Sequence, residues 1–428
     1  MKRAAVAVVL AALLCGSMAA APVPARARVL FEEGEYRLEL RSAFKGSLLL
    51  YFPPTDPGVP TDDTAGGGFF RLRFDVNASL TQYFSAAIAY EQRARASSSP
   101  VGSSTLPPLA PAPWRASPLD WVIVDGSPGY LHQHELDRAY LALHLPFLEL
   151  TVGRQAIGLG RGAIFSAVDI FAPFTPNEVD REWRRGVDAI HAELRIPGVS
   201  ELSADVIVAF GAIDDDELTT FVALGRIRAL VGDVDGSVLL GRRGEDNMLA
   251  ATLSANIGDA EGHGEIAFYG TDGQGIDGGL AGTDRVVMKA LLGASYQIDI
   301  GDGLMVLFEY HYSGFGIENV GRDASILRDP AFGARFLRGD SQILGRHALA
   351  LSLSYPISDE VSASVSYLQS PTDGSGTVAP TVVWNHSDNV TIAANVTIPW
   401  GSGPVDGVPT SELGSAPLTI FLQARIYD

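Results

Sequence analysis

The stretch Glu35–Lys45 reads EYRLELRSAFK, and apolar and polar side chains alternate along it. One face carries Tyr36, Leu38, Leu40 and Phe44, and the opposite face carries Glu35, Arg37, Glu39, Arg41 and Lys45. Because successive side chains of a β-strand point to opposite faces, this period of two predicts a strand. An apolar face opposite so charged a face suits a strand with lipid on one side and water on the other, as in a transmembrane β-barrel.

The same alternation recurs along the chain, for example in Phe70–Asn77 and Val390–Ile398. A soluble, half-buried strand gives the same pattern in one segment, so it is the repetition that favours a barrel. The pattern predicts an all-β, antiparallel, up-and-down barrel of about 18 strands, with 16 as the alternative. The strands are expected at 35–50, 68–78, 83–95, 134–145, 147–157, 185–196, 201–211, 219–230, 233–243, 247–257, 261–271, 284–297, 303–314, 346–355, 359–369, 380–386, 390–398 and 417–427.

The connections between these strands alternate in length, which a soluble β-sandwich has no reason to do. Short ones such as Ser79–Gln82 are interleaved with long ones such as Ala96–Gln133 and Phe315–Gly345. Short periplasmic turns and long extracellular loops are the rule for outer-membrane barrels. At roughly ten residues per strand plus loops, 428 residues fit one barrel domain.

The first 27 residues have the features of a signal peptide. Lys2 and Arg3 precede an apolar run, Ala4–Leu14, that is too short to span a bilayer. Cleavage is expected between Ala21 and Ala27, which leaves 28–428 as the barrel. The only cysteine, Cys15, lies in the removed segment, so disulfide and thiol chemistry are excluded from the mature chain. Leu14 is a poor fit to the small residue that lipidation of Cys15 would require.

The charge of the mature chain excludes one class of function. Cleavage after Ala27 lowers the basic residues from 31 to 28 against 50 acidic ones, a net charge of −22. So acidic a chain does not favour nucleic-acid binding.

After the first 27 residues, no stretch offers about 18 uninterrupted apolar residues, which argues against membrane helices. The last predicted strand ends in Tyr427–Asp428, whereas outer-membrane barrels usually end in an aromatic residue that the assembly machinery recognises.

One segment, Val152–Ile190, differs in texture from the rest of the chain. Its motifs are GRQ-x-I-x-x-G-x-G from Gly153 to Gly162, VDIFAPFTP over Val168–Pro176, and DREWRRGVDA over Asp180–Ala189. The segment resembles one found in Gram-negative outer-membrane barrels related to alginate-export and other porin-like proteins. The resemblance implies a porin-like outer-membrane barrel, and it does not imply alginate as the substrate.

The long connection inside this segment, 158–184, is rich in Phe and Pro and is predicted to fold into the barrel lumen. Its charged residues would then form a constriction or anchor the loop: Arg154, Arg161, Asp169, Asp180, Arg181, Glu182, Arg184, Arg185 and Asp188. Opposed charges across a constriction select solutes by charge and size, whereas Arg–carboxylate pairs hold a loop in place. We expect Asp169, Asp180, Arg181 and Asp188 to anchor the loop, and Arg161, Arg184 and Arg185 to face solute.

The polar faces of the predicted strands supply the lumen wall. The inward-facing charged residues are expected to be Arg37, Arg41, Arg71, Arg73, Arg138, His191, Glu193, Arg195, Arg285 and Lys289. A basic cluster in the first half of an otherwise acidic chain would favour anionic solutes. The alternative is that these residues pair with neighbours such as Glu35, Glu39, Asp75 and Glu193, and the sequence leaves both interpretations open.

These features predict a porin-like channel for passage or export of small hydrophilic solutes, with anions as a candidate class, across the bacterial outer membrane. No enzymatic activity and no cofactor or metal is expected: there is no Gly-x-Ser-x-Gly motif, and His132 and His134 are more simply a strand-end pair than ligands. A structural or adhesive barrel, and an outer-membrane enzyme, are the alternatives. The expected partners are outer-membrane lipid and lipopolysaccharide, the solute and the assembly machinery. Solute identity, transport direction, oligomeric state and whether the pore is open stay undetermined by the sequence.

Overall fold

The computed structural model describes residues 28–57, 64–98, 114–117, 119–126, 129–176, 178–196, 201–211, 220–271, 286–328 and 330–428. Most of this chain forms one antiparallel sheet. Its strands are β1 (Arg28–Glu33), β2 (Tyr36–Phe52), β3 (Ala65–Ser79), β4 (Phe84–Ser97), β5 (Asp120–Gly126), β6 (Tyr130–His144), β7 (Leu148–Gln155), β8 (Val187–Arg195), β9 (Leu202–Gly211), β10 (Thr220–Val231), β11 (Val234–Arg243), β12 (Asp246–Ile257), β13 (Ala260–Gly270), β14 (Val286–Ile298), β15 (Leu304–Ser313), β16 (His347–Pro356), β17 (Val361–Gln369), β18 (Gly376–Ser387), β19 (Val390–Trp400) and β20 (Leu418–Tyr427). A 3₁₀ turn, η1 (Ala324–Arg328), and one helix, α3 (Pro330–Leu337), lie in the connection between β15 and β16.

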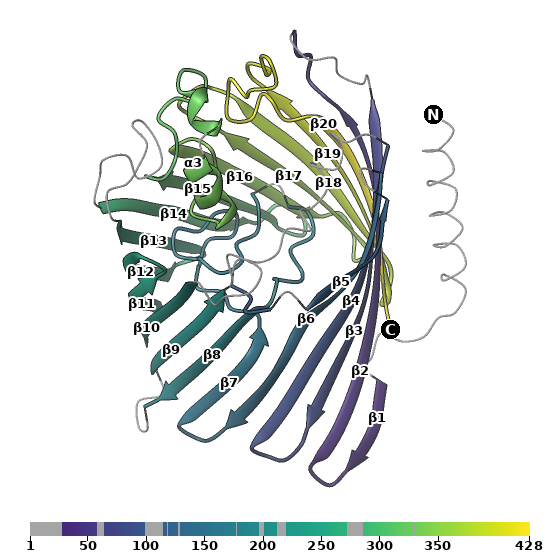
Figure 1. The fold of residues 1–428 in the computed structure, drawn as a ribbon, viewed down its shortest axis with the longest axis vertical. Helices are drawn as coiled ribbons and strands as arrows, with labels where there is room; N and C mark the ends of the chain where they lie inside the picture. The colour runs from purple at the N-terminus through teal and green to yellow at the C-terminus, as the bar shows by residue number, and fades with distance from the viewer. Residues whose placement is uncertain are drawn as a thin grey trace.

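The sheet closes on itself as a barrel with 18 strand positions. Each strand pairs with the next, except that β4 pairs with β6, and the ring is completed where Ala43–Phe52 of β2 pairs with β20. The turns at the end of the barrel where β1 meets β2, β3 meets β4 and β6 meets β7 are short, and α3 lies at the other end (Figure 1). That other end also includes the two-residue turn between β11 and β12. The predicted 18-stranded antiparallel barrel is therefore confirmed.

Two short strands, β1 and β5, were not predicted. Each lies in the wall in line with another strand, β1 with β20 and β5 with β7, and pairs with the same neighbour. β20 pairs with the upper part of β2, and β1 pairs with Tyr36–Leu40 below it. Arg28 at the start of β1 forms an ion pair with Asp428, with Nη2 at 2.6 Å from Oδ2. The two ends of the described chain therefore share one position in the wall.

The second shared position lies where β7 leaves the wall. β7 pairs with Ala139–His144 of β6, whereas β5 pairs with Tyr130–Glu135 higher on the same strand. Between them the Arg154 guanidinium binds Asp188 through Nε at 2.7 Å and the carbonyl oxygen of Leu136 at 3.0 Å. The sequence prediction placed β5, DWVIVDG, in the connection Ala96–Gln133, although its Trp, Val and Ile are residues that favour strands.

The strand faces follow the predicted alternation. The outward side chains form an exposed apolar band that includes Ile88, Leu141, Val206, Val238, Leu253 and Leu292. On the inward face, β8–β14 carry buried apolar side chains that pack against the loops inside the barrel, such as Ile207, Leu224, Met248 and Tyr269. From those loops, Ile170, Phe171, Phe315 and Phe332 complete the cluster. This half of the barrel interior is therefore packed with loop residues, while the wall formed by β2–β6 carries charges.

One strand boundary differs from its prediction for a clear reason. β18 was expected to begin at Pro380 but begins at Gly376. Proline lacks the N–H that a central strand needs, and it usually marks a boundary. Here Pro380 keeps its place opposite Val365 of β17, and the Asn395 side chain donates to its carbonyl oxygen at 3.3 Å. Residues 1–27, with the predicted signal peptide, lie outside the described residues, as does Arg285.

Candidate functional site: a loop across the lumen

The connection between β7 and β8, residues 156–186, lies inside the barrel, as Figure 1 shows. Two buried wall carboxylates, Glu265 of β13 and Glu309 of β15, hold its first half. Glu265 accepts hydrogen bonds from the backbone N–H groups of Arg161, Gly162, Ala167 and Val168 and from the Ser166 hydroxyl. Glu309 accepts from the N–H groups of Ala163, Ile164 and Phe165, at 2.6, 3.0 and 2.9 Å. Seven of these eight bonds are donated by the main chain, so they do not depend on a polar side chain of the loop.

The glycines of the GLGRG motif allow this close approach. A Cβ atom at Gly160 would collide with the Ser166 hydroxyl and lie 2.9 Å from Glu265 Oε1. At Gly162 a Cβ would collide with the carbonyl oxygen of Phe165 and the Leu291 side chain. The glycine-rich motif is therefore the part of the loop that wraps around Glu265.

The second half of the loop reaches the opposite wall, at β2. Lys45 Nζ lies 2.7 Å from Asp180 Oδ1 and 2.7 Å from Glu182 Oε2, and only 1% of the lysine side chain is exposed. The Tyr427 hydroxyl of β20 donates to Glu182 Oε2 at 2.7 Å. Although burial alone would raise the pKa of the Asp180 carboxyl, the charge of Lys45 and its hydrogen bond hold that pKa below its ordinary value. The loop thus crosses the lumen between two anchored ends.

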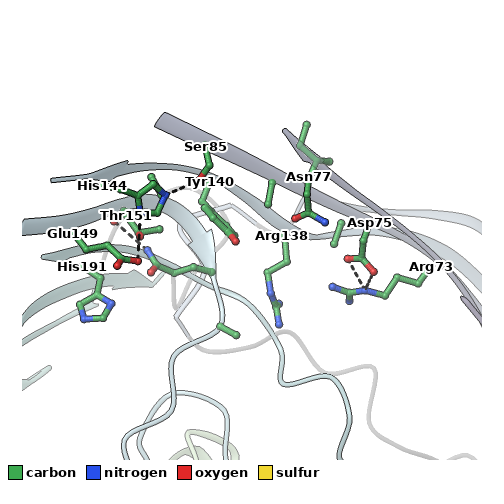
Figure 2. A pocket seen from close by; sticks show the side chains of 16 residues that line it. Arg73, Asp75, Asn77, Ser85, Arg138, Tyr140, His144, Glu149, Thr151 and His191 are labelled. Atoms are coloured by element: carbon green, nitrogen blue, oxygen red, sulfur yellow. Dashed lines mark hydrogen bonds and ion pairs between the residues drawn. The ribbon is translucent and has the colours of Figure 1, made fainter. Parts of the chain in front are cut away.

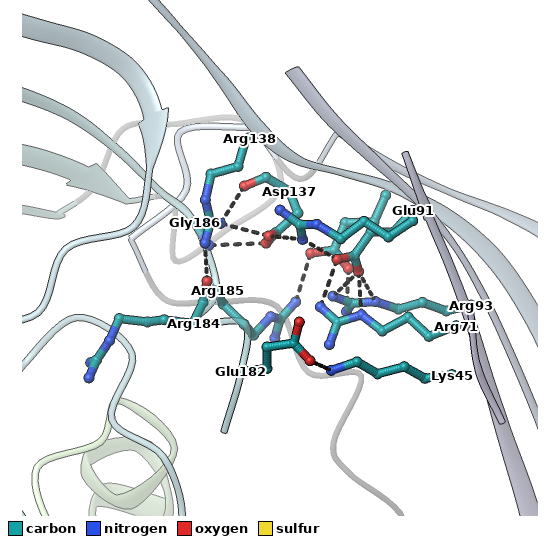
Figure 3. A network of polar contacts seen from close by, with 12 residues as sticks. Lys45, Arg71, Glu91, Arg93, Asp137, Arg138, Glu182, Arg184, Arg185 and Gly186 are labelled. Atoms are coloured by element: carbon teal, nitrogen blue, oxygen red, sulfur yellow. Dashed lines mark hydrogen bonds and ion pairs between the residues drawn. The ribbon is translucent and has the colours of Figure 1, made fainter. Parts of the chain in front are cut away.

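A dense network of buried charges lies beside this crossing point (Figure 3). Glu91 of β4 is fully buried and pairs with Arg71, Arg73 and Arg93. Asp137 and Glu135 of β6 extend the network to Arg115, Arg138 and Arg185. Burial lowers the pKa of the Arg185 guanidinium to about 10, although the charge of Glu135 opposes this shift. Together with Asp75 and the Lys45 contacts, the crossing point holds seven basic and six acidic side chains, an excess of one positive charge.

A cavity of about 410 Å³ opens on the inner wall next to this network and is lined by β3, β4, β6, β7 and β8 (Figure 2). Arg73 and Arg138 belong to both the network and the cavity. The other polar groups in its lining include Asp75, Asn77, Tyr140, Glu149, Thr151 and His191. The cavity offers both hydrogen-bond donors and acceptors to a hydrophilic solute.

The structure places the predicted loop residues as follows. Asp169 pairs with Arg184, Asp180 and Glu182 with Lys45, Arg185 with Glu135, and Asp188 with Arg154. Arg181 donates to the carbonyl oxygens of Ala163 and Pro176, and Arg161 reaches Asp235 of β11. Each of the nine therefore has a protein partner. Whether Arg161, Arg184 and Arg185 also meet solute stays a prediction, and their side chains are 29%, 26% and 23% exposed.

The predicted wall residues fall into three groups. Arg71, Arg73 and Arg138 belong to the buried network, and Lys289 is buried. Arg37 and Arg41 pair with Glu39, Arg195 pairs with Glu149 and Glu193, and His191 pairs with Asp205. Arg285 lies outside the described residues. The wall charges are thus mostly paired, which was one of the two interpretations that the sequence left open.

Five carboxylates of the site were not predicted from the sequence: Glu91, Glu135, Asp137, Glu265 and Glu309. Alternation would have placed Glu265 and Glu309 on inner faces, because their neighbours Ile266 and Phe308 point outward and are exposed. Nothing local to those strands reveals that the partner is a loop 104 residues from Glu265 and 146 residues from Glu309.

The two histidines near the start of β6 lie side by side. His132 and His134 stack at 5.8 Å between ring centroids, and in the described part of the chain no three His, Cys, Asp or Glu residues gather to hold a metal ion. None of the described helices is long and apolar enough to cross a membrane.

The long connections at the α3 end also contact one another, through Glu412. Its carboxylate accepts from the N–H groups of Leu344, at 2.7 Å, and Gly345. Burial raises the pKa of this carboxyl to about 7, against the opposing effect of the two backbone hydrogen bonds. The nearby Asp373 carboxylate also favours the protonated form.

This contact predicts a pH-dependent stability. Because the pKa of Glu412 is higher in the folded chain than in the unfolded chain, the folded state binds the proton more tightly, and stability should fall as pH rises from near 4.5 to about 7. Glu412→Gln should lose that part of the pH dependence. Thermal unfolding of both proteins in detergent between pH 4 and pH 8 measures the difference, and parallel curves would contradict the prediction.

No protein-family model matches the chain, and no curated protein matches it. Solved structures do. Acinetobacter baumannii OccAB1 is 8% identical with a TM-score of 0.55, covering 95% of this chain and 99% of that one. Pseudomonas aeruginosa OccK11 (OpdR) is 11% identical at 0.53, covering 91% and 95%, and A. baumannii OccAB4 is 9% identical at 0.51, covering 91% and 98%.

These structure neighbours are porins of Gram-negative outer membranes. At such low identities the likeness establishes the fold alone, a closed, antiparallel 18-stranded barrel with about 2% helix. The narrower resemblance to alginate-export proteins stays a prediction.

Proposed function

We propose that this chain is a porin-like channel of the bacterial outer membrane. Small hydrophilic solutes would pass through its lumen, beside the loop that crosses it. One observation carries the proposal: a closed barrel presents an apolar band outside and, around the loop 156–186, a polar wall inside. An apolar exterior with a polar interior is the arrangement of barrels that hold water inside a membrane. The porin neighbours support the channel assignment, and the signal-peptide features support export to the outer membrane.

We further propose a modest preference for anions. The crossing point has one excess positive charge, and it sits among the wall arginines of β3 and β4. In a water-filled passage such an excess lowers the barrier for anions more than for cations. The preference is expected to be small because nearly every basic group there already pairs with a carboxylate.

The test is conductance in planar lipid bilayers. Purified, refolded protein should give stable open steps, and bilayers that stay sealed over many insertions would contradict the channel and favour a structural or adhesive barrel. A turnover lost on a single Ser or His substitution would instead support an enzyme.

Selectivity can be tested on the three arginines expected to face solute. Replacing Arg161, Arg184 and Arg185 with glutamine removes three positive charges that are each about one quarter exposed. In a salt gradient the reversal potential should move toward that of a cation-selective pore. The matched control replaces the same residues with lysine, which keeps the charge. An unchanged reversal potential in the glutamine variant would assign these arginines to anchoring alone.

A further inference from the structure

The indole of Trp183, near the end of the loop, lies among three basic side chains of the opposite wall. Lys45 Nζ is 3.7 Å from the ring centroid, and the guanidinium carbons of Arg71 and Arg73 lie at 4.8 and 5.0 Å. Cations over the face of a tryptophan ring are attracted to its π electrons. In the sequence, Trp183 comes directly after Glu182 and shortly after Asp180, the two residues whose carboxylates bind Lys45. The segment Asp180–Trp183 thus presents two anions and an aromatic face to one basic patch.

The attachment of the loop at β13 and β15 differs in kind from its attachment at β2. At β13 and β15, two carboxylates bind eight donors, seven of them backbone N–H groups, and Phe165 and Ala167 lie in a buried apolar cluster. At β2 the contacts are made by side chains alone, and the acidic partners are partly exposed, Asp180 by 18% and Glu182 by 34%. Side-chain ion pairs that water can reach exchange easily for hydrated ions, whereas a buried main-chain attachment does not. The β2 attachment can therefore open while the attachment at β13 and β15 holds the first half of the loop in place.

We propose that Asp180–Trp183 is a releasable latch: held against Lys45, Arg71 and Arg73 it narrows the passage, and released it widens the passage. The proposal rests on the channel function proposed above. In the latched state the segment also neutralises Lys45 and covers the faces of the two arginines. Release would expose that basic patch to the lumen, so the open state should favour anions more than the latched state does.

The test compares Lys45→Met with Arg41→Met. Both remove a basic residue from the inner face of β2, but Arg41 contacts Glu39 and is 63% exposed. Lys45→Met should raise the single-channel conductance roughly twofold, because the segment leaves the wall, and Arg41→Met should not. The variant Asp180→Asn with Glu182→Gln leaves the barrel wall untouched and should give the same rise, which covers the case in which Lys45→Met does not fold.

A second measurement is independent of conduction. The fluorescence of Trp183 is obtained as the difference between each protein and the same protein carrying Trp183→Phe. Iodide should quench this signal weakly in the wild type and in Arg41→Met, and strongly in Lys45→Met. If the signal stays protected in both latch variants, or if Trp183 is released while conductance is unchanged, the latch is wrong. A wild-type protein that never conducts would refute the channel, and the quenching would still report the latch.

Discussion

Replacing both Glu265 and Glu309 with alanine is expected to detach the first half of the loop from the wall and raise the conductance more than release of the latch does. Eight groups of the loop donate hydrogen bonds to these carboxylates and would lose their acceptors inside the barrel. An unsatisfied buried donor costs about 1–3 kcal/mol, so the loop gains by moving into water. We expect the conductance to rise by more than about twofold and the current to become noisy as the freed loop moves in the lumen.

The matched control is the double substitution Glu149→Ala with Glu193→Ala. These two carboxylates also lie on the inner wall, but they are 38% and 33% exposed and pair only with side chains. Glutamine at 265 and 309 keeps one acceptor oxygen per residue and should give an intermediate conductance. A conductance equal to that of the control would mean that the buried apolar cluster alone holds the loop.

Glu91→Leu is expected to destabilise the barrel more than any other single substitution in the wall. The carboxylate is fully buried and accepts from Arg71 at 2.7 and 2.8 Å and from Arg93 at 2.6 and 2.8 Å, and it also pairs with Arg73. Without it three guanidinium groups remain close together with too few anions. Removing one partner from a buried ion pair typically costs about 3–5 kcal/mol. The urea midpoint of the protein folded into lipid vesicles should fall accordingly.

The control for this prediction is Glu193→Leu, which removes a partly exposed carboxylate 3.6 Å from Arg195. Exposed pairs contribute about 0–1 kcal/mol, so its midpoint should stay close to the wild-type value. Adding Arg73→Gln to Glu91→Leu should restore part of the lost stability, since it removes one of the uncompensated charges. Equal midpoints for Glu91→Leu and Glu193→Leu would show that the arginines find other partners.

The strands could be predicted from the sequence because each is encoded locally. Alternation in segments such as Glu35–Lys45 depends only on which side chains meet lipid and which do not. β1 and β5 escaped prediction because they share positions with β20 and β7, an arrangement that depends on where distant strands end. DWVIVDG in β5 has no alternation to mark an inner and an outer face.

The loop inside the barrel was predicted from its composition and motifs, but its contacts were not. The pairs Lys45–Asp180 and Arg161–Asp235 join residues 135 and 74 positions apart, and any of several acidic residues would satisfy the same local rule. Arg154 and Asp188 were grouped with the loop by the sequence prediction, yet they pair in the wall where β7 ends. Charge on an inner face indicates that a residue belongs to the interior, and only the closed barrel decides its partner.

The shared position of β1 and β20 has a consequence for chain connectivity. β20 runs down the barrel to Asp428, which exchanges backbone hydrogen bonds with Ser42, and β1 resumes in the same direction at Arg28, opposite Leu40. Along β2, the position opposite Arg41 is the only gap between the end of β20 and the start of β1. A peptide link of about one residue, at some 3.3 Å per residue, would therefore turn them into one continuous strand. An engineered chain that begins at Arg28 and ends at Asp428 could then be circularised without displacing a strand.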